Sequence, residues 1–468
     1  MLTNLDFLGN GRLWPPKSER KRLQRYRDNR LLFQGEHHEV FKEIWQRLFR
    51  VEWQLSVEIV LNWPKRLSTL WSDLLIGERP SLSDSKDKEN GSVYFEGLAD
   101  KINLWKSAYI AAIDTSRYGD SVFKVRRDDK GNVKISVIPP EFWFPIVSPT
   151  DAKEITHHVI AWPSLKDYEN PLNTDGTLHV EVHTPEAIGY REYKLPPHGG
   201  TLGAPIAESM EENTAGRMLI VHCPGLETSD TVYGMDDYDD LTSVMQELEV
   251  RFAQVAKVLD KHGDPKMYGP SSVLVKDEMT GKLKADVGDY WPVDDEESPP
   301  GYIVWNAQLE HSFTQIKGLM EQFYMLSETS PAVFGKIESG LAESGSALKR
   351  LFMAPLAKVN RVRMNFDPAL REVLTIAAIL DGKDENSIAP VIGWKDGLPD
   401  DEAEQVNMAS TAVSAGISSK RSAMKRAFGL DDEQTDEEMR QIEAESKAEM
   451  LDSPDAPLDD GGDDNGDE

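Results

Sequence analysis

Three stretches of this 468-residue sequence have residue types that could do chemistry. Two are carboxylate runs, DDYDD at 236–240 and VDDEES at 293–298, and carboxylate oxygens bind divalent cations. The third, GLAESGSA, has the glycine spacing of a phosphate-binding loop, but Ser346 stands where that loop requires lysine. Neither a His-Glu-x-x-His zinc motif nor a Gly-x-Ser-x-Gly nucleophile elbow occurs. Solvated helix starts and loops explain the acidic runs better than a metal site, so we expect no catalysis, no metal and no cofactor.

The composition is strongly acidic, with a formal net charge of −29. About half of this excess lies in residues 431–468, which hold 17 acids and two bases. Such a chain is not suited to gripping DNA by its phosphates, because that affinity comes from clustered lysine and arginine. An acidic channel in which DNA slides without sticking remains compatible with it. From about Leu451 the sequence is low in complexity and acidic, which predicts disorder.

The single cysteine, Cys223, excludes internal disulfides and multi-cysteine zinc sites, and it is typical of a reducing compartment. No apolar run approaches the roughly 18 residues needed to cross a bilayer, and the N-terminus lacks a signal-peptide pattern. A basic cluster precedes residue 31, and we interpret it as one face of a solvated amphipathic helix rather than a nucleic-acid contact. Its members are Lys17, Arg20, Lys21, Arg22, Arg25, Arg27 and Arg30.

Hydrophobic periodicity predicts several long helices. One begins at Asn62 with Pro64 in its first turn and ends at Gly77, a second covers about 94–116, and a third runs from 241 to Gly263. A fourth region, 306–380, has the pattern of a helix, a glycine-rich loop and a second helix. Pro355 should kink that second helix, because proline removes a backbone donor and clashes with the preceding turn.

Strand patterns lie between these helices. Residues 122–127 and 133–138 predict a hairpin closed by an Asp-Lys-Gly-Asn turn, and further strands are expected near 155–162, 178–183, 190–195 and 218–223. We predict loops at 81–92 and 196–216. Segment 264–305 is rich in proline and turns, with short strands expected at 272–276 and 303–305.

Four phrases in this order resemble portal proteins of tailed double-stranded DNA bacteriophages, of the long-tailed siphovirus type. They are NWPKRL near residue 62, the GD–strand–turn–strand–proline phrase after Gly119, G-x-DDYDD before residue 241, and the SG-SALKRLF-x-APL run that follows Ser330. The motifs are loose, but together the resemblance covers nearly the whole chain.

The resemblance implies an α+β portal fold with an α/β wing, long stem helices, a small β-rich clip and a helical crown. The implied boundaries are 1–235 for the wing, 236–263 and 306–328 for stem helices, 264–305 for the clip and 329–345 for a tunnel loop. A kinked wing-side helix and connector would occupy 346–399, crown helices 400–450, and an acidic tail 451–468.

The tunnel loop is expected to be mobile and to line a DNA channel. Lys336 is its only cation, and its glycines lower the cost of changing backbone angles. Lys336 would therefore meet phosphate, with two further cations behind it at the helix start. The channel-loop residues are Gly335, Lys336, Gly340, Glu343, Gly345, Lys349 and Arg350.

The clip combines aromatic and acidic residues, a composition often found at interfaces. Its predicted partner-binding residues are Tyr290, Trp291, Asp294, Asp295, Glu296 and Tyr302. The implied partners are eleven further copies in a twelve-subunit ring, passing DNA, a terminase motor, head-to-tail adaptors, and the capsid and scaffolding proteins. The protein would be assembled in the host cytoplasm and sit at a capsid vertex of the virion.

Two other classes of function stay open at this point. A nucleic-acid-processing enzyme could use the acidic clusters, although phosphate-loop and histidine chemistry are missing. A scaffolding or coiled-coil assembly protein is the other, and the β-rich segments at 120–223 and 264–305 argue against it.

Overall fold

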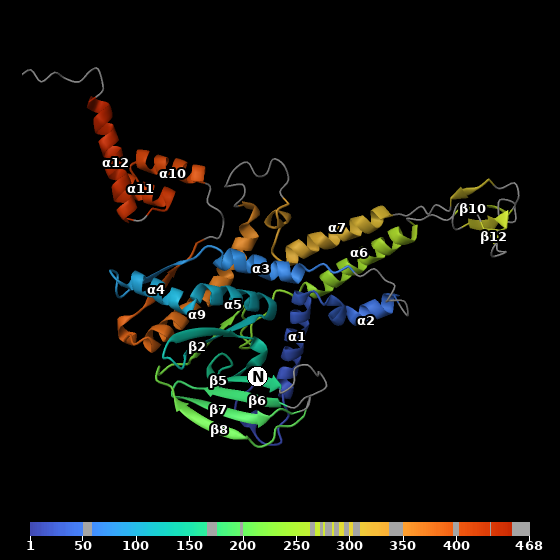
Figure 1. Cartoon of the computed structure of the whole chain (residues 1–468), viewed down its shortest axis with the longest axis horizontal. Coiled ribbons are helices and arrows are strands. Elements are labelled where there is room, and N and C mark those ends of the chain that lie inside the picture. The colour runs from blue at the N-terminus through green and yellow to red at the C-terminus, as the bar shows by residue number, and fades with distance from the viewer. Residues whose placement is uncertain are drawn as a thin grey trace, which may run out of the picture. The chain divides into compact units, whose positions relative to one another are not determined.

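A computed structural model describes residues 1–49, 59–165, 176–196, 200–262, 267–271, 275–276, 283–284, 290–293, 299–302, 309–336, 350–395, 402–430 and 432–451. The chain divides into two compact units. The first comprises Met1–Ile337 and Leu351–Gly397, and the second comprises Glu338–Arg350 and Leu398–Glu468. Helices and strands are both abundant, as an α+β fold requires (Figure 1).

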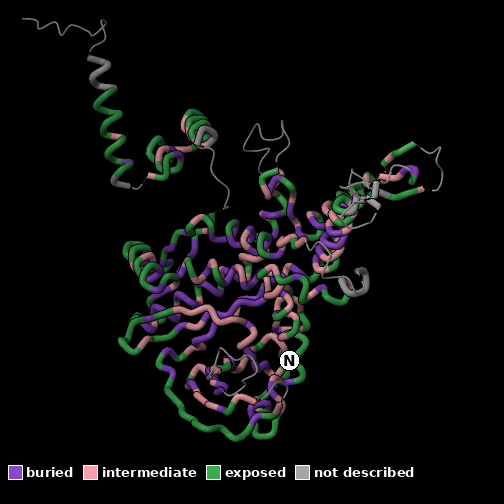
Figure 2. Tube along the Cα trace, turned by 45° about the vertical axis from the view of Figure 1, so that its right-hand side comes forward, coloured by how far each residue is buried: buried purple, intermediate pink, exposed green. Residues whose placement is uncertain are grey.

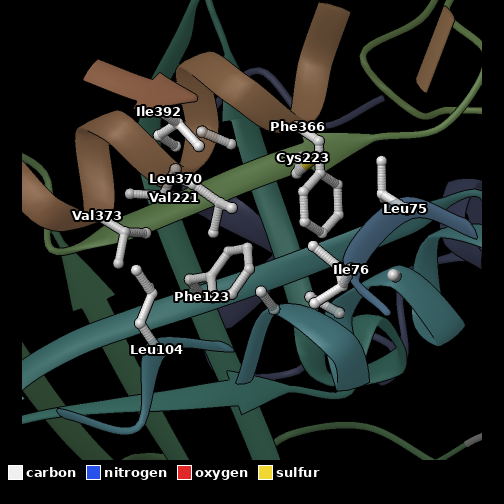
Figure 3. Packing of buried hydrophobic residues seen from close by; sticks show 14 of the residues in the cluster. Leu75, Ile76, Leu104, Phe123, Val221, Cys223, Phe366, Leu370, Val373 and Ile392 are labelled. Carbon is white, nitrogen blue, oxygen red and sulfur yellow. The ribbon is translucent and has the colours of Figure 1, made fainter. Parts of the chain in front are cut away.

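The first unit has a central antiparallel sheet whose strand order is β3-β2-β9. The strands are β2 (Asp120–Arg127), β3 (Val133–Ile138) and β9 (Ile220–Pro224). Two long helices, α5 (Leu104–Tyr118) and α9 (Met353–Leu380), pack against these strands (Figure 1). In Figure 3, Phe366, Leu370 and Val373 of α9 meet Phe123 and Val221 of the sheet. This is the largest apolar core among the described residues, and it fixes α9 against the sheet.

The helix α3 (Trp63–Ile76) forms where its sequence signals predicted. The side-chain oxygen of Asn62 accepts a hydrogen bond from the Lys65 amide at 3.1 Å, which satisfies an unpaired first-turn donor. Pro64 lies in the first turn and Gly77 ends the helix. The predicted apolar stripe is buried, and it consists of Leu67, Leu70, Trp71, Leu74 and Leu75.

A second, five-stranded antiparallel sheet has the sequential order β4-β5-β6-β7-β8. Its strands are β4 (Trp143–Val147), β5 (Ile155–Leu165), β6 (Gly176–His183), β7 (Ala187–Lys194) and β8 (Ala207–Glu212). Phe7, Leu8 and Trp14 of the N-terminal segment pack with its inner residues in a separate apolar cluster. The edge strand β8 is exposed along its length (Figure 2).

The N-terminal helices are α1 (Arg20–Gln34) and α2 (His37–Phe49). The interpretation of the basic cluster as a solvated helix face is wrong for three of its arginines. Arg22 pairs with Glu19 at 2.8 Å, Arg25 with Asp236 at 2.9 Å, and Arg30 with Glu141 at 2.5 Å. Arg22 also donates to the carbonyl oxygens of Pro140 and Trp143. The arginines thus join α1 to the start of β4, to the turn before it and to the segment before residue 242, so their charge is used within the chain.

Two long amphipathic helices, α6 (Thr242–His262) and α7 (Leu309–Leu326), lie side by side (Figure 1). Both were predicted. Between them the structure describes short strands, which agrees with the β-rich composition. They are β10 (Met267–Pro270), β11 (Val275–Lys276), β12 (Leu283–Lys284), β13 (Tyr290–Val293) and β14 (Gly301–Tyr302). Residues 272–274 and 303–305 of the predicted strands lie outside the described residues.

The second unit holds three helices, α10 (Glu402–Ser414), α11 (Lys420–Phe428) and α12 (Asp432–Leu451). The predicted break at Gly416 is confirmed, because this glycine has a φ of +70°. Arg421 of α11 pairs with Asp436 of α12 at 2.7 Å. The predicted disordered tail, beyond Leu451, lies outside the described residues.

Three local predictions are wrong. The helix expected over 94–116 is two helices, α4 (Gly91–Ile102) and α5, because Asn103 adopts a left-handed conformation with φ +53°. The loop expected at 81–92 contains strand β1 (Ser81–Asp84), which pairs with β15 (Pro390–Gly393) in the segment predicted as a connector. The loop expected at 196–216 contains β8.

Pro355 coincides with an interruption of the helix, as predicted. Arg350 and Leu351 are helical, the chain leaves helical geometry at Phe352, with φ −97° and ψ 5°, and α9 begins at Met353. Pro355 therefore lies in the first turn, where its missing N–H has no partner to lose. The proline inside the helix is Pro368. Among the described residues there are five short 3-10 turns: η1 (Asp6–Leu8), η2 (Lys17–Glu19), η4 (Pro140–Phe142), η6 (Pro331–Phe334) and η7 (Glu385–Ser387).

A buried histidine between the sheets should make the fold acid-sensitive. The Trp143 indole donates to Nδ1 of His158 at 3.0 Å, so this ring is neutral. Burial, with neighbouring His222, His183 and His157, lowers the pKa of His158 to about 3. Protons then bind the unfolded chain preferentially, so stability is full above pH ~6.5 and falls below it, by about 2 kcal/mol at pH ~5.

We expect His158→Gln to remove that share of the acid dependence, since glutamine accepts a hydrogen bond but does not titrate in this range. Urea unfolding at several pH values measures the slope of the free energy of unfolding against pH. The exposed His38→Gln substitution serves as the control and should leave the slope as it is. Equal acid slopes in the wild type and His158→Gln would contradict the assignment.

Candidate functional site

The candidate loop leaves α7 through a short ordered turn. Ser330 is extended, Pro331 opens η6, and Gly335 ends it with a φ of +83°, a value that favours glycine. Lys336 follows, exposed, and its amide donates to the Pro331 carbonyl at 3.0 Å. The described chain resumes at Arg350, which is exposed.

An aromatic cluster holds the base of the loop. Trp63 of α3 lies 5.0 Å from Phe323 of α7 and 5.6 Å from Phe334 of η6, measured between ring centroids. Tyr324 lies 6.1 Å from Phe334. Aromatic pairs at such separations add about 0.5–1.5 kcal/mol each beyond the area they bury. The loop therefore departs from a packed base formed by three separate elements.

Two ion pairs lie beside this base, around a small cavity of about 110 Å³. Lys358 of α9 is 8% exposed, and its Nζ lies 2.7 Å from Asp237 and 4.3 Å from the ring centroid of Trp71. Arg361, one turn further along α9, pairs with Glu328. Helix α9 follows the loop, and both ion pairs connect it to segments that precede the loop.

Glu328 also has an unusual backbone. Its φ of +56° lies in the left-handed region, which costs a non-glycine residue roughly 1–3 kcal/mol. The adjacent hydroxyls of Ser327 and Thr329 are buried and lie 2.6 Å apart. The chain thus turns sharply at the end of α7, and Arg361 forms an ion pair with the side chain of the strained residue, Glu328.

The structure covers part of the predicted channel-loop set. Gly335, Lys336 and Arg350 are described, and both cations are exposed. The other members, Gly340, Glu343, Gly345 and Lys349, lie outside the described residues, so the assignment of this set stays a prediction.

The predicted clip residues are partly described as well. Strands β13 and β14 flank β10, and β13 runs parallel to it. Trp291 is 63% exposed and Tyr302 57% exposed, which is unusual for large aromatic side chains. Tyr290 is the first residue of β13. Asp294, Asp295 and Glu296 lie outside the described residues.

Sequence reasoning missed the residues that support the loop. Asp236 and Asp237 were interpreted as part of a solvated helix start, but the first pairs with Arg25 and the second with Lys358. The sequence signal available was a lysine and an arginine three residues apart in an otherwise apolar helix pattern. That pattern indicates a cationic stripe but cannot identify its acidic partners.

The arrangement offers little for bond-making chemistry. Burial raises the pKa of the Cys223 thiol well above its ordinary value, which disfavours a reactive thiolate. Within the described ranges, no group of three or more histidine, cysteine or carboxylate side chains could hold a metal ion. Across those same ranges, none of the helices has the length and apolar character for a membrane span. What the site provides is an exposed cationic turn on a rigid base.

Comparison with known proteins identifies the class as a structural protein of phage particles. The family model described as "Phage portal protein, SPP1 Gp6-like" matches residues 17–451. The chain therefore belongs to this portal protein family, and its role is that of a portal protein at a capsid vertex, as a ring-forming oligomer of a phage head.

Two solved structures are similar to the chain at 10% sequence identity and a TM-score of 0.46. One is a chain of the neck of an empty GTA particle, computed with C6 symmetry, and the similarity covers 79% of this chain and 90% of that one. The other belongs to the virion of a native gene transfer agent particle, with 90% and 96% covered. No curated protein matches the chain.

Proposed function

We propose that twelve copies of this portal protein form a ring through which DNA is packaged and ejected, and that the 329–345 loops contact the passing DNA. The ring would assemble in the host cytoplasm. The observation that supports the loop's role is the exposed Lys336 immediately after Gly335, on a base packed by Trp63, Phe323 and Phe334. A rigid base followed directly by an exposed lysine suits a weak contact with DNA phosphate that is repeated in every subunit.

The electrostatics favour guidance over tight binding. A ring of single lysines within a protein of net charge −29 per chain attracts phosphate locally while the surroundings repel it. Tight, salt-sensitive DNA binding requires several phosphate contacts per protein, which one lysine does not provide. The loops would centre the duplex and leave it free to move.

Segment 264–305 would be the docking surface for the terminase motor and, after packaging, for head-to-tail adaptors. The exposed Trp291 and Tyr302 support this, since aromatic side chains are enriched in protein interfaces. The wing would meet the capsid and scaffolding proteins.

Substitution of Lys336 by glutamate tests the proposed loop contact. Rings should assemble normally, because Lys336 is exposed and only its backbone makes a described hydrogen bond. Packaged DNA should fall by about tenfold, equivalent to about 1.4 kcal/mol, as attraction turns into repulsion in every subunit. Electron microscopy shows whether rings form, and the amount of nuclease-protected DNA measures packaging.

The control is Lys194→Glu, which makes the same charge change at an exposed position at the end of β7. It should leave packaging within about twofold of the wild type. A second variant combines Lys336→Glu with a loop shortened between residues 337 and 349. If packaging were unchanged in both loop variants, the loop would be a simple connector and the proposal would fail.

A further inference from the structure

One edge of the central sheet is open. In the order β3-β2-β9, strand β2 is paired on both sides, whereas β3 is paired by β2 alone among the described strands. In an antiparallel pair, about every second residue of an edge strand turns its N–H and C=O outward. Such an edge is a template for another strand unless it is blocked. Strand β3, VKISVI, contains no proline.

A pocket of about 720 Å³ runs along this edge. Residues 133–137 of β3 form one side of it, and residues from the end of α4 and the start of α5 form the other. Figure 1 shows α5 next to β2, and both α4 and α5 contact β3. Ile102 and Val133 are buried, and Ile135 and Val137 are partly buried against the main core. The pocket thus has an apolar floor beside unpaired backbone.

The pocket is cationic in a protein that is otherwise acidic. Its charged lining residues are Asp128, Lys101, Lys106, Lys130 and Lys134. Lys101 pairs with Asp381 at 2.7 Å, and Lys134 pairs with Asp128 at 3.0 Å. Lys106 and Lys130 are exposed and form no ion pair with any described residue. Two lysines on opposite sides of the groove are therefore available for an anionic ligand.

We propose that this groove binds an extended acidic segment of a partner protein, which adds a strand to the outer edge of β3. Backbone hydrogen bonds to β3 would provide affinity, as in other cases of strand addition. Successive side chains of an added strand face opposite ways, so apolar residues can cover the floor while carboxylates reach the lysine rim. The site is independent of the channel loop.

The shape and lining of the groove favour a peptide over DNA. Carboxylates on a short extended chain fit between Lys106 and Lys130, and the partly buried Ile135 and Val137 gain apolar contacts from its alternate residues. A duplex would present phosphates to the rim but leave the apolar floor and the backbone groups of β3 uncovered.

Fluorescence anisotropy on the assembled full-length ring tests this. The probe is a labelled peptide of alternating aspartate and valine, about nine residues long, which exceeds a typical strand. We expect saturable binding that weakens when salt rises from about 50 to about 300 mM. The double variant Lys106→Glu/Lys130→Glu should weaken binding by at least about tenfold. The matched control, Lys21→Glu/Lys194→Glu, changes two exposed lysines elsewhere and should stay within about twofold.

Three further probes separate the alternatives. A peptide of alternating lysine and valine should not bind, and N-methylation of alternate backbone amides should abolish binding by the acidic peptide, because it removes strand pairing. A short DNA duplex that bound more tightly than the peptide, and was lost in the Lys106→Glu/Lys130→Glu variant, would overturn the proposal in favour of a phosphate site. Binding to dissociated subunits but not to rings would also overturn it, since the edge would then be an interface between copies.

Discussion

Substitution of Lys358 by alanine should lower the free energy of unfolding by about 3–5 kcal/mol, the range for removing one partner of a buried ion pair. The loss is large because Asp237 stays behind in a partly buried position, with the Ser116 hydroxyl at 2.5 Å as its remaining described side-chain donor. The Nζ of Lys358 also lies over the Trp71 ring, and alanine removes that cation–π contact. Urea unfolding of the purified protein measures the effect.

Two variants separate charge from packing. Lys358→Met keeps the apolar stem, so its cost should fall below that of alanine but remain above about 2 kcal/mol while Asp237 is unpaired. Adding Asp237→Asn to Lys358→Met should recover part of the loss, because the uncompensated charge is then gone. If Lys358→Ala cost less than about 1 kcal/mol, the pair would not fix α9 to the segment before α6.

The Lys358 pair also explains how the loop is held. Glu328, which precedes the loop, and Lys358 and Arg361, which follow it, line one small cavity. The loop is thus closed at its root by contacts between segments that are distant in sequence. Loosening of the root would lower DNA packaging together with stability, whereas Lys336→Glu should lower packaging alone.

The sequence predicted those parts of the fold that rest on local signals. Helix α3 was bounded correctly because Asn62, Pro64 and Gly77 each act within one turn of the helix end. The β2–β3 hairpin was predicted because its turn residues and alternating strands are adjacent in sequence. The family, too, was recognised from short phrases, whose order along the chain mattered more than any one of them.

The elements that the sequence did not predict share a physical cause, because their formation depends on residues that are distant in sequence. Strand β1 exists because it pairs with β15, about 300 residues away, and its own sequence is polar. Strand β8 is exposed on both faces, so it has no apolar alternation to detect. Asn103 divides two helices by adopting a left-handed conformation that many asparagines do not adopt. In the candidate site, Lys336 was predicted from charge, but its supports were not, because ion pairs such as Arg361 with Glu328 leave no local pattern.

Substitution of Asp120 by alanine should also destabilise the protein by about 3–5 kcal/mol, since a fully buried charge is removed from partners that remain. Asp120 is 0% exposed and accepts three hydrogen bonds. They come from the Tyr26 hydroxyl at 2.5 Å, the His222 ring at 2.7 Å and the Gly234 amide at 2.9 Å. One carboxylate therefore connects α1, β9 and the segment that leads into α6.

Separate variants test how much each hydrogen bond of Asp120 contributes to stability. Asp120→Asn keeps an oxygen acceptor and should cost about 1–2 kcal/mol, and Tyr26→Phe, which removes one donor, should cost about the same. Asp129→Ala serves as the matched control, because Asp129 is exposed in the β2–β3 turn, and it should stay within about 0.5 kcal/mol of the wild type.

The stability measurements should use one fixed protein concentration, because assembly into rings adds its own stabilisation. Limited proteolysis offers a second readout that a general loss of stability would not reproduce. In Asp120→Ala, cleavage should appear first between residues 225 and 240, the segment whose amide at Gly234 loses its acceptor. Cleavage distributed evenly over the chain, or a loss below about 1 kcal/mol, would show that Asp120 does not hold the segment before α6. The position of α6 would then depend on the Lys358 pair and on Arg25 with Asp236.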